Sequence, residues 1–147
     1  MAKLHIAEQY IEDVLSGKIL ACKYVIQACQ RQKDDIQNGI DRGLYFDRKK
    51  ALKAIKFFSY MKLYKGKWAG KTFELQAWQA FILWCLFGWY NADGTRRYRY
   101  AYIAVPRKNG KTTFAAGIGL YMMLADGENA AQIYSAATKA QQARICF

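Results

Sequence analysis

Histidine, proline and acidic residues are all scarce in this chain of 147 residues, which has one histidine, one proline, and 11 acidic residues against 23 lysines and arginines. The single histidine, His5, excludes a histidine-based catalytic triad and a multi-histidine metal site. The four cysteines, at 22, 29, 85 and 146, form no Cys-x-x-Cys pair, so neither a four-cysteine zinc site nor a redox motif is expected. Scattered thiols of this kind predict a reducing cytoplasm.

Long hydrophobic runs are also missing. The longest apolar stretch, residues 77–90, is interrupted by Gln79 and is shorter than the roughly 20 residues of a membrane-spanning helix. The first 14 residues carry acidic residues and no long apolar run, unlike a secretory signal. We therefore expect no membrane partner.

What the chain does contain is apolar material and positive charge. It is 53% hydrophobic, enough for the core of one domain, and its formal net charge is +12. Residues 1–71 hold 15 basic and 7 acidic residues, against 8 and 4 in residues 72–147. Charge alone favours any anionic partner, whether nucleic acid, a nucleotide or an anionic membrane surface. Of these we expect the first two.

Hydrophobic spacing predicts four helices in the first 90 residues. They cover 5–16, about 18–38, 48 to about 61, and 76–87. Gly17 and Gly39 are expected to end the first two, and Asp47 is expected to cap the third. Cys22 and Cys29 share one side of the second helix, which favours packing. The lysine-rich side of the third helix (Lys49, Lys50, Lys53 and Lys56) is either solvated or a contact for a polyanion.

The second half predicts an α/β arrangement. A turn at 91–94 leads to a strand at 98–104, in which Tyr98, Tyr100 and Tyr102 share one face and Arg99, Ala101 and Ile103 the other. A loop, an apolar helix at 111–124 and a short strand at 132–136 follow, and Thr138 is expected to cap a last helix. Strand, loop, helix and strand in this order favour a parallel sheet.

The loop before residue 111 has the chemistry of a phosphate site. Gly110-Lys111-Thr112 matches the end of the pattern GxxxxGK[ST], although Val105 stands where the first glycine is expected. A glycine lets backbone N–H groups approach phosphates, a lysine supplies a point charge for the β- and γ-phosphates, and a threonine hydroxyl suits Mg²⁺. The helix that begins here directs its positive end at the same phosphates.

The same tripeptide also occurs at Gly70-Lys71-Thr72, where no strand precedes it and no helix follows at once. Context therefore favours residues 106–112 over 70–72. Arg107 and Lys108 either form a solvated turn, or Arg107 stabilises charge on the γ-phosphate. Upstream, Gln79 and Trp78 could recognise adenine by hydrogen bonding and stacking, or serve as a helix-start residue and a core residue.

At this point the sequence resembles a known family. The resemblance runs from about residue 45 to residue 147 and follows these segments in order: Gly66-x-Trp68-Ala69-Gly70-Lys71, Leu75-x-x-Trp78-Gln79, Phe87-Gly88-Trp89, Asp93-Gly94-x-Arg96-Arg97, Pro106-Arg107-Lys108-Asn109-Gly110-Lys111-Thr112, Asp126-Gly127-Glu128, and Ala136-Ala137-Thr138-Lys139-x-Gln141-x-Ala143-Arg144. These segments are similar to the large terminase subunits of tailed bacteriophages, the ATPases that drive DNA into proheads.

The resemblance implies a fold and a set of roles. The fold would be part of the parallel sheet of a P-loop NTPase of the RecA-like kind, with an N-terminal helical region at 1–44 and the ATPase part at 45–147. Lys111 and Arg107 would act in catalysis, Thr112 would bind Mg²⁺, and ATP would be the cofactor. The implied ATP-binding residues are Gln79, Trp78, Pro106, Arg107, Lys108, Asn109, Gly110, Lys111, Thr112 and Thr113. Ala77 stands where the family has proline, a departure at the adenine motif.

The resemblance also implies partners and a setting: double-stranded DNA, a small terminase subunit, a portal, a homo-oligomeric ring, and phage assembly in the host cell cytoplasm. Family members carry an apolar strand ending in Asp-Glu and a nuclease domain, and neither follows Thr112 here. We therefore expect an N-terminal piece of such a subunit that binds ATP, turns it over poorly and is poorly soluble alone. Two alternatives are a basic, non-enzymatic nucleic-acid-binding module and a helicase-like ATPase fragment.

Overall fold

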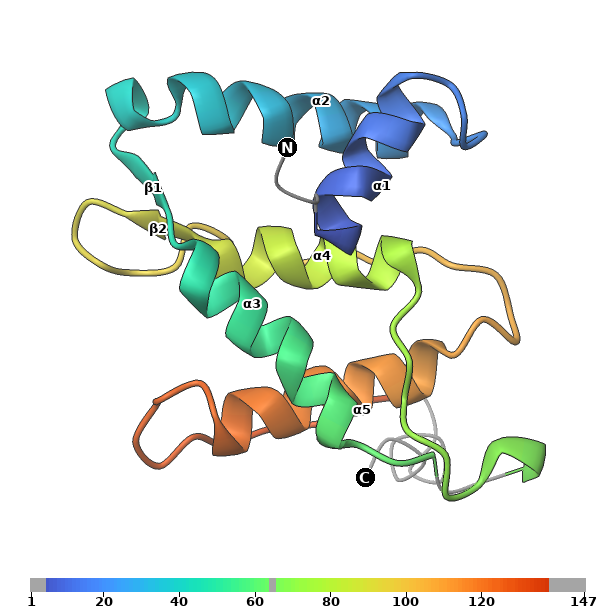
Figure 1. Cartoon of the computed structure of the whole chain (residues 1–147). Helices are drawn as coiled ribbons and strands as arrows, with labels where there is room; N and C mark the ends of the chain where they lie inside the picture. The colour runs from blue at the N-terminus through green and yellow to red at the C-terminus, as the bar shows by residue number, and fades with distance from the viewer. Residues whose placement is uncertain (1–4, 64–65, 138–147) are drawn as a thin grey trace. The chain divides into compact units, whose positions relative to one another are not determined.

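The computed structural model describes residues 5–63 and 66–137 and divides the chain into two compact units (Figure 1). Unit 1 comprises Met1–Ile55 and Glu74–Ala101, and unit 2 comprises Lys56–Phe73 and Tyr102–Phe147. Each unit is built from segments that are far apart in the sequence. No helix in the described residues is both long and apolar enough to cross a membrane.

Unit 1 begins with helix α1 (Ile6–Leu15), whose first turn is fixed by the only histidine. The Ala7 N–H donates to His5 Nδ1, and the His5 N–H donates to a Glu8 carboxylate oxygen at 2.9 Å. The His5 ring also stacks on Trp84 at 5.5 Å between ring centroids. Burial is the main cause of a lowered pKa at His5. The histidine therefore caps a helix and packs on the core.

The core of unit 1 lies where α1 packs against α2 (Lys23–Asn38) and α4 (Ala77–Gly88). Tyr10, Ile11 and Val14 of α1 form one buried cluster with Cys29 of α2 and Phe81 of α4. A second cluster joins buried alanines of α1, α3 (Arg48–Phe57) and α4 to Trp84. Small residues at these contacts let the helices approach closely, because no bulky side chain separates them.

The sheet found in the described residues is a ribbon of two short strands. β1 (Leu44–Phe46) pairs antiparallel with β2 (Trp89–Asn91), with Tyr45 opposite Tyr90. Gly88 precedes β2, and a Cβ at this position would collide with the Phe46 ring. The close approach of Phe46 to the end of α4 therefore requires a glycine.

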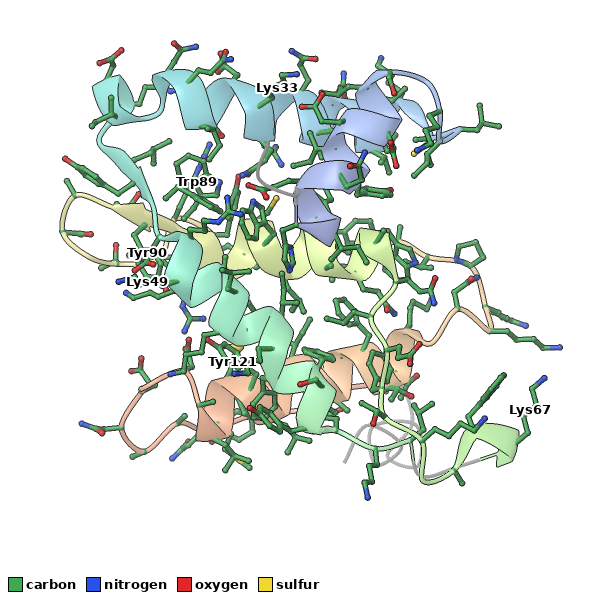
Figure 2. All side chains as sticks on the ribbon, viewed as in Figure 1. Lys33, Lys49, Lys67, Trp89, Tyr90 and Tyr121 are labelled. Atoms are coloured by element: carbon green, nitrogen blue, oxygen red, sulfur yellow. The ribbon has the colours of Figure 1, made fainter. Side chains whose placement is uncertain are left out.

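A polar cluster ties α2 to the segment after α4. Asp35 is 2% exposed, and its carboxylate accepts hydrogen bonds from the guanidinium groups of Arg42 and Arg97. One helical turn earlier, the Trp89 indole N–H donates to Gln32 Oε1 at 2.7 Å. Figure 2 shows Trp89 between α2 and α4. Buried charge is tolerated here because both carboxylate oxygens have cationic partners.

Unit 2 is organised around Phe58 and helix α5 (Lys111–Leu124). Phe58 is fully buried between the rings of Phe73 and Phe114, at centroid distances of 5.5 and 5.6 Å. Gly117 of α5 lies against the same ring, and a Cβ there would collide with Phe58. A larger residue would push α5 away from Phe58, because packed interiors yield little.

The observed helices confirm much of the sequence-based prediction. α1, α4 and α5 form as expected, and Asp47 caps α3, since the Lys50 N–H donates to Asp47 Oδ1 at 3.0 Å. α2 begins at residue 23 and not at 18, so Ile19 and Leu20 precede it and Leu20 is fully exposed. α3 ends at Phe57, with a short 3₁₀ turn after it. The expected last helix after Thr138 lies outside the described residues.

The expected strands at 98–104 and 132–136 are not formed in the described residues. Residues 101–105 form no regular secondary structure, and Tyr100 and Tyr102 are 94% and 95% exposed. A β-strand is held by hydrogen bonds to a neighbouring strand. The alternation of residue types along one segment does not show whether such a neighbour exists. The described sheet is antiparallel, so the parallel sheet is not seen, and the P-loop NTPase fold stays a prediction.

Candidate phosphate-binding loop

The predicted phosphate loop forms an exposed turn directly before α5. Lys108 and Gly110 both have positive φ, +67° and +69°, and Asn109 stands between them. The Asn109 side-chain amide donates to the backbone carbonyls of Pro106 and Arg107, each at 3.3 Å. Asn109 therefore fastens the turn, and Gly110 supplies the left-handed conformation from which the helix starts.

The helix that follows presents free N–H groups at its first turn. Gly110 occupies the N-cap position, where no side chain caps the helix, and the Gly110 carbonyl accepts from the Phe114 N–H at 2.9 Å. The first N–H groups of a helix have no partner within the helix and carry the positive end of its dipole. In this arrangement the N–H groups of Lys111, Thr112 and Thr113 are suited to an anion.

The side chains around this helix start are cationic. Arg107, Lys108 and Lys111 are exposed, and the segment 106–113 contains no acidic residue. Among the ion pairs between described residues, none involves these three cations. The turn therefore joins three positive side chains to a helix N-terminus. This donor set fits a polyphosphate.

Helix α5 has an exposed first turn and a buried apolar side, and the buried side fixes the helix that follows the loop. Lys111 and Thr112 face solvent, whereas Phe114, Gly117 and Tyr121 are buried within unit 2. The Tyr121 ring meets Phe57 edge-on at 5.5 Å. The apolar side of the helix is thus anchored, and its first turn is left open to a ligand.

The predicted adenine residues lie in unit 1, at the start of α4. Gln79 is buried, and its Oε1 accepts from the Gln76 N–H at 2.9 Å, so it acts as the helix-start residue. Trp78 is half-buried and packs against the cluster that contains Tyr10 and Phe81. The structure accordingly gives both residues a structural role. Their contact with adenine stays a prediction.

The competing tripeptide Gly70-Lys71-Thr72 lies in a hairpin and starts no helix. Lys62 and Thr72 form an antiparallel bridge, and the Leu63 N–H donates to the Lys71 carbonyl at 2.9 Å. Gly110 alone of the two precedes a helix, as the sequence predicts, but the strand expected before it is not formed in the described residues. The choice of residues 106–112 as the phosphate site stays a prediction.

A separate hollow of about 410 Å³ lies in unit 1. Its walls include Trp84, Phe46 and Gln32, and two ion pairs, Glu8 with Arg48 and Glu12 with Lys33, stand at its edge. None of the predicted site residues lines it. Because the charged side chains are already paired with one another, the hollow offers no surplus charge to a phosphate.

Comparison with known families gives a match for the second half of the chain. Residues 77–147 match the family model described as the terminase large subunit, ATPase domain. This segment is therefore similar to the ATPase domain of a terminase large subunit, and we call residues 77–147 the terminase segment. The match includes both Gln79 and the loop 106–113. No curated protein and no solved structure matches the chain.

Several residues of the terminase segment are explained by their contacts with the first 46 residues. Gly88 makes room for Phe46, Trp89 donates to Gln32, and Arg97 pairs with Asp35. The start of the terminase segment is therefore packed against α2 and β1.

Sequence reasoning did not find Gln32 and Asp35. Both lie at helical spacing from Cys29, and these three are the buried residues of α2. The sequence does contain a signal for them, because two polar residues fall on the side of the helix that carries the buried Cys29, and buried polar groups need partners.

Proposed function

We propose that this chain binds ATP through residues 106–113 and serves as the ATP-binding part of a phage terminase large subunit, the motor ATPase that packages DNA into proheads. The observation that carries the proposal is the uncapped N-terminus of α5 beside Gly110, Lys111 and Arg107. The match to the terminase ATPase domain supports the same conclusion. The phage assembles in the host cell cytoplasm.

Each residue of the loop has a role in this proposal. The N–H groups of Lys111, Thr112 and Thr113 bind phosphate oxygens, and the Lys111 ammonium neutralises the β- and γ-phosphates. Arg107 contacts the γ-phosphate, where negative charge grows during transfer. Pro106, Lys108 and Asn109 hold the turn, and Gln79 and Trp78 take the adenine.

The donor set for magnesium is small. Thr112 is the proposed protein ligand, and no cluster of three acidic, histidine or cysteine side chains exists in the described residues. A hydroxyl oxygen is a suitable hard ligand, and Mg²⁺ usually completes its shell with phosphate oxygens and water. When bound, the ion would neutralise phosphate charge. We propose that this chain alone hydrolyses ATP slowly, because no carboxylate lies in the loop to orient a water.

The test is competition for the site at equilibrium. A fluorescent ATP analogue with Mg²⁺ is bound to the chain and displaced with ATP, ADP or AMP. We expect ATP and ADP to displace it at least tenfold more effectively than AMP, since the loop is built for the β- and γ-phosphates. Equal displacement by AMP would place recognition at the base and sugar and contradict the proposal.

A further inference from the structure

The hairpin between Met61 and Phe73 is a second concentration of positive charge in unit 2. The Phe73 N–H donates to the Met61 carbonyl at 2.8 Å, and the Gly70 N–H donates to the Leu63 carbonyl at 2.7 Å. Phe73 is buried against Phe58, so the base of the hairpin is fixed to the core. The 3₁₀ turn η3 (Gly66–Trp68) lies in its exposed part.

An exposed tryptophan lies between two lysines in this hairpin. Trp68 is 50% exposed, and the ammonium groups of Lys67 and Lys71 lie 5.0 and 4.6 Å from its ring centroid. Figure 2 shows Lys67 pointing away from the ribbon. Lys62 is exposed on the opposite strand of the hairpin. We call Lys62, Lys67, Trp68 and Lys71 the basic hairpin surface.

No acidic residue balances this charge within the hairpin. The sequence from 61 to 73 contains four lysines and neither aspartate nor glutamate. Unit 2 as a whole has two acidic residues, Asp126 and Glu128, against ten basic ones. The ten are Lys56, Lys62, Lys65, Lys67, Lys71, Arg107, Lys108, Lys111, Lys139 and Arg144.

The two ammonium groups form cation–π contacts with the Trp68 ring, and their positive charge remains available to an anionic partner. Clustered lysines bind a nucleic-acid backbone by neutralising its phosphates, and such contacts do not read the sequence. In the hairpin the lysines would neutralise phosphates, and the contacts with Trp68 hold two of them in place.

We propose that the basic hairpin surface contacts the phosphodiester backbone of duplex DNA. The choice of duplex DNA as the partner rests on the proposed function. The choice of surface rests only on the residues of the hairpin. It requires no contribution from Lys111. The Gly70-Lys71-Thr72 tripeptide therefore acts on a polyanion, but on DNA and not on a nucleotide.

The experiment measures binding of the chain to a labelled short duplex at several salt concentrations between about 50 and 200 mM. The Lys67→Ala/Lys71→Ala double variant is expected to bind about tenfold more weakly. The slope of log K against log salt is negative, and we expect its magnitude to fall by about 2 in this variant. Trp68→Ala removes the ring that positions Lys67 and Lys71 and is expected to weaken binding by about two- to fivefold.

The matched control is Lys18→Ala/Lys33→Ala, which removes the same charge from lysines already paired with Asp13 and Glu12. We expect this control and Lys111→Ala to bind DNA within about twofold of the unaltered chain. Retained binding of the ATP analogue by the hairpin variants shows that they are folded.

Three results would overturn the proposal. The first is no DNA binding by the unaltered chain. The second is an equal loss of affinity in the hairpin variant and the lysine control, which would reflect net charge only. The third is displacement of DNA by ATP at constant ionic strength in the Lys111→Ala variant, which would make the hairpin a nucleotide site. Failure of ATP binding with DNA binding intact would count against the proposed function alone.

Discussion

Replacing Lys111 with alanine is expected to weaken binding of ATP with Mg²⁺ by about 10- to 100-fold, because a charge-assisted hydrogen bond contributes about 1.5–3 kcal/mol. The Lys111 ammonium is exposed at the first turn of α5, beside the N-terminal N–H groups. Truncation removes the point charge and leaves the helix intact, since alanine is a good helix former. Equilibrium titration with a fluorescent ATP analogue measures the change.

The chain contains its own control for this prediction. Lys71 stands in the same Gly-Lys-Thr tripeptide, but in a hairpin instead of at a helix N-terminus. Lys71→Ala is expected to leave ATP affinity within about twofold, because Lys71 is exposed, stands at no helix N-terminus, and has its charge screened at ordinary salt. Equal loss of ATP affinity in both variants would mean that net charge, and not loop geometry, attracts the nucleotide.

Replacing Asp35 with alanine is expected to lower the free energy of unfolding of unit 1 by about 3 kcal/mol, since removing one partner of a buried ion pair leaves a charge uncompensated. The Asp35 side chain is 1% exposed, and that of its partner Arg97 is 19% exposed. The contact with Arg42 contributes less, because that side chain is 48% exposed. Arg97 also lies over the Trp89 and Tyr98 rings, so its displacement would disturb β2.

Asp34 provides the matched comparison for Asp35. It pairs with the same Arg42 at 3.0 Å, but its side chain is 47% exposed. Asp34→Ala is expected to cost less than about 1 kcal/mol, as exposed ion pairs do. Urea unfolding followed by tryptophan fluorescence compares the two variants. Similar midpoints would show that the Asp35 cluster does not hold α2 to the terminase segment.

The features that the sequence predicted correctly are those that depend on residues close together in the chain. α5 forms over Lys111–Leu124 as expected, because Gly110 marks its start and a long apolar run continues from there. The capping of α3 by Asp47 and the turn ending at Gly94 also depend only on residues a few positions apart. Of the two Gly-Lys-Thr copies, only the one at Gly110 precedes a helix, which the local pattern also predicted.

The sequence could not predict what depends on distant partners. The tyrosine alternation at 98–104 was taken as a strand, yet a strand needs a hydrogen-bonded neighbour, and the described residues supply none. The Asp34-Asp35 pair resembles ordinary surface charge until α2 is set against Arg97, which is 62 residues away. The structural reasons for Gly88 and Trp89 likewise appear only with Phe46 and Gln32 in place.

The most direct test of the central claim is amide hydrogen exchange of the chain with and without ATP and Mg²⁺. The account holds that phosphates bind the N–H groups of Lys111, Thr112 and Thr113, which no side chain caps. It predicts that ATP slows exchange in peptides covering 107–113, while AMP leaves these peptides unchanged. Protection by ATP that appears elsewhere and leaves 107–113 unaffected would contradict the account.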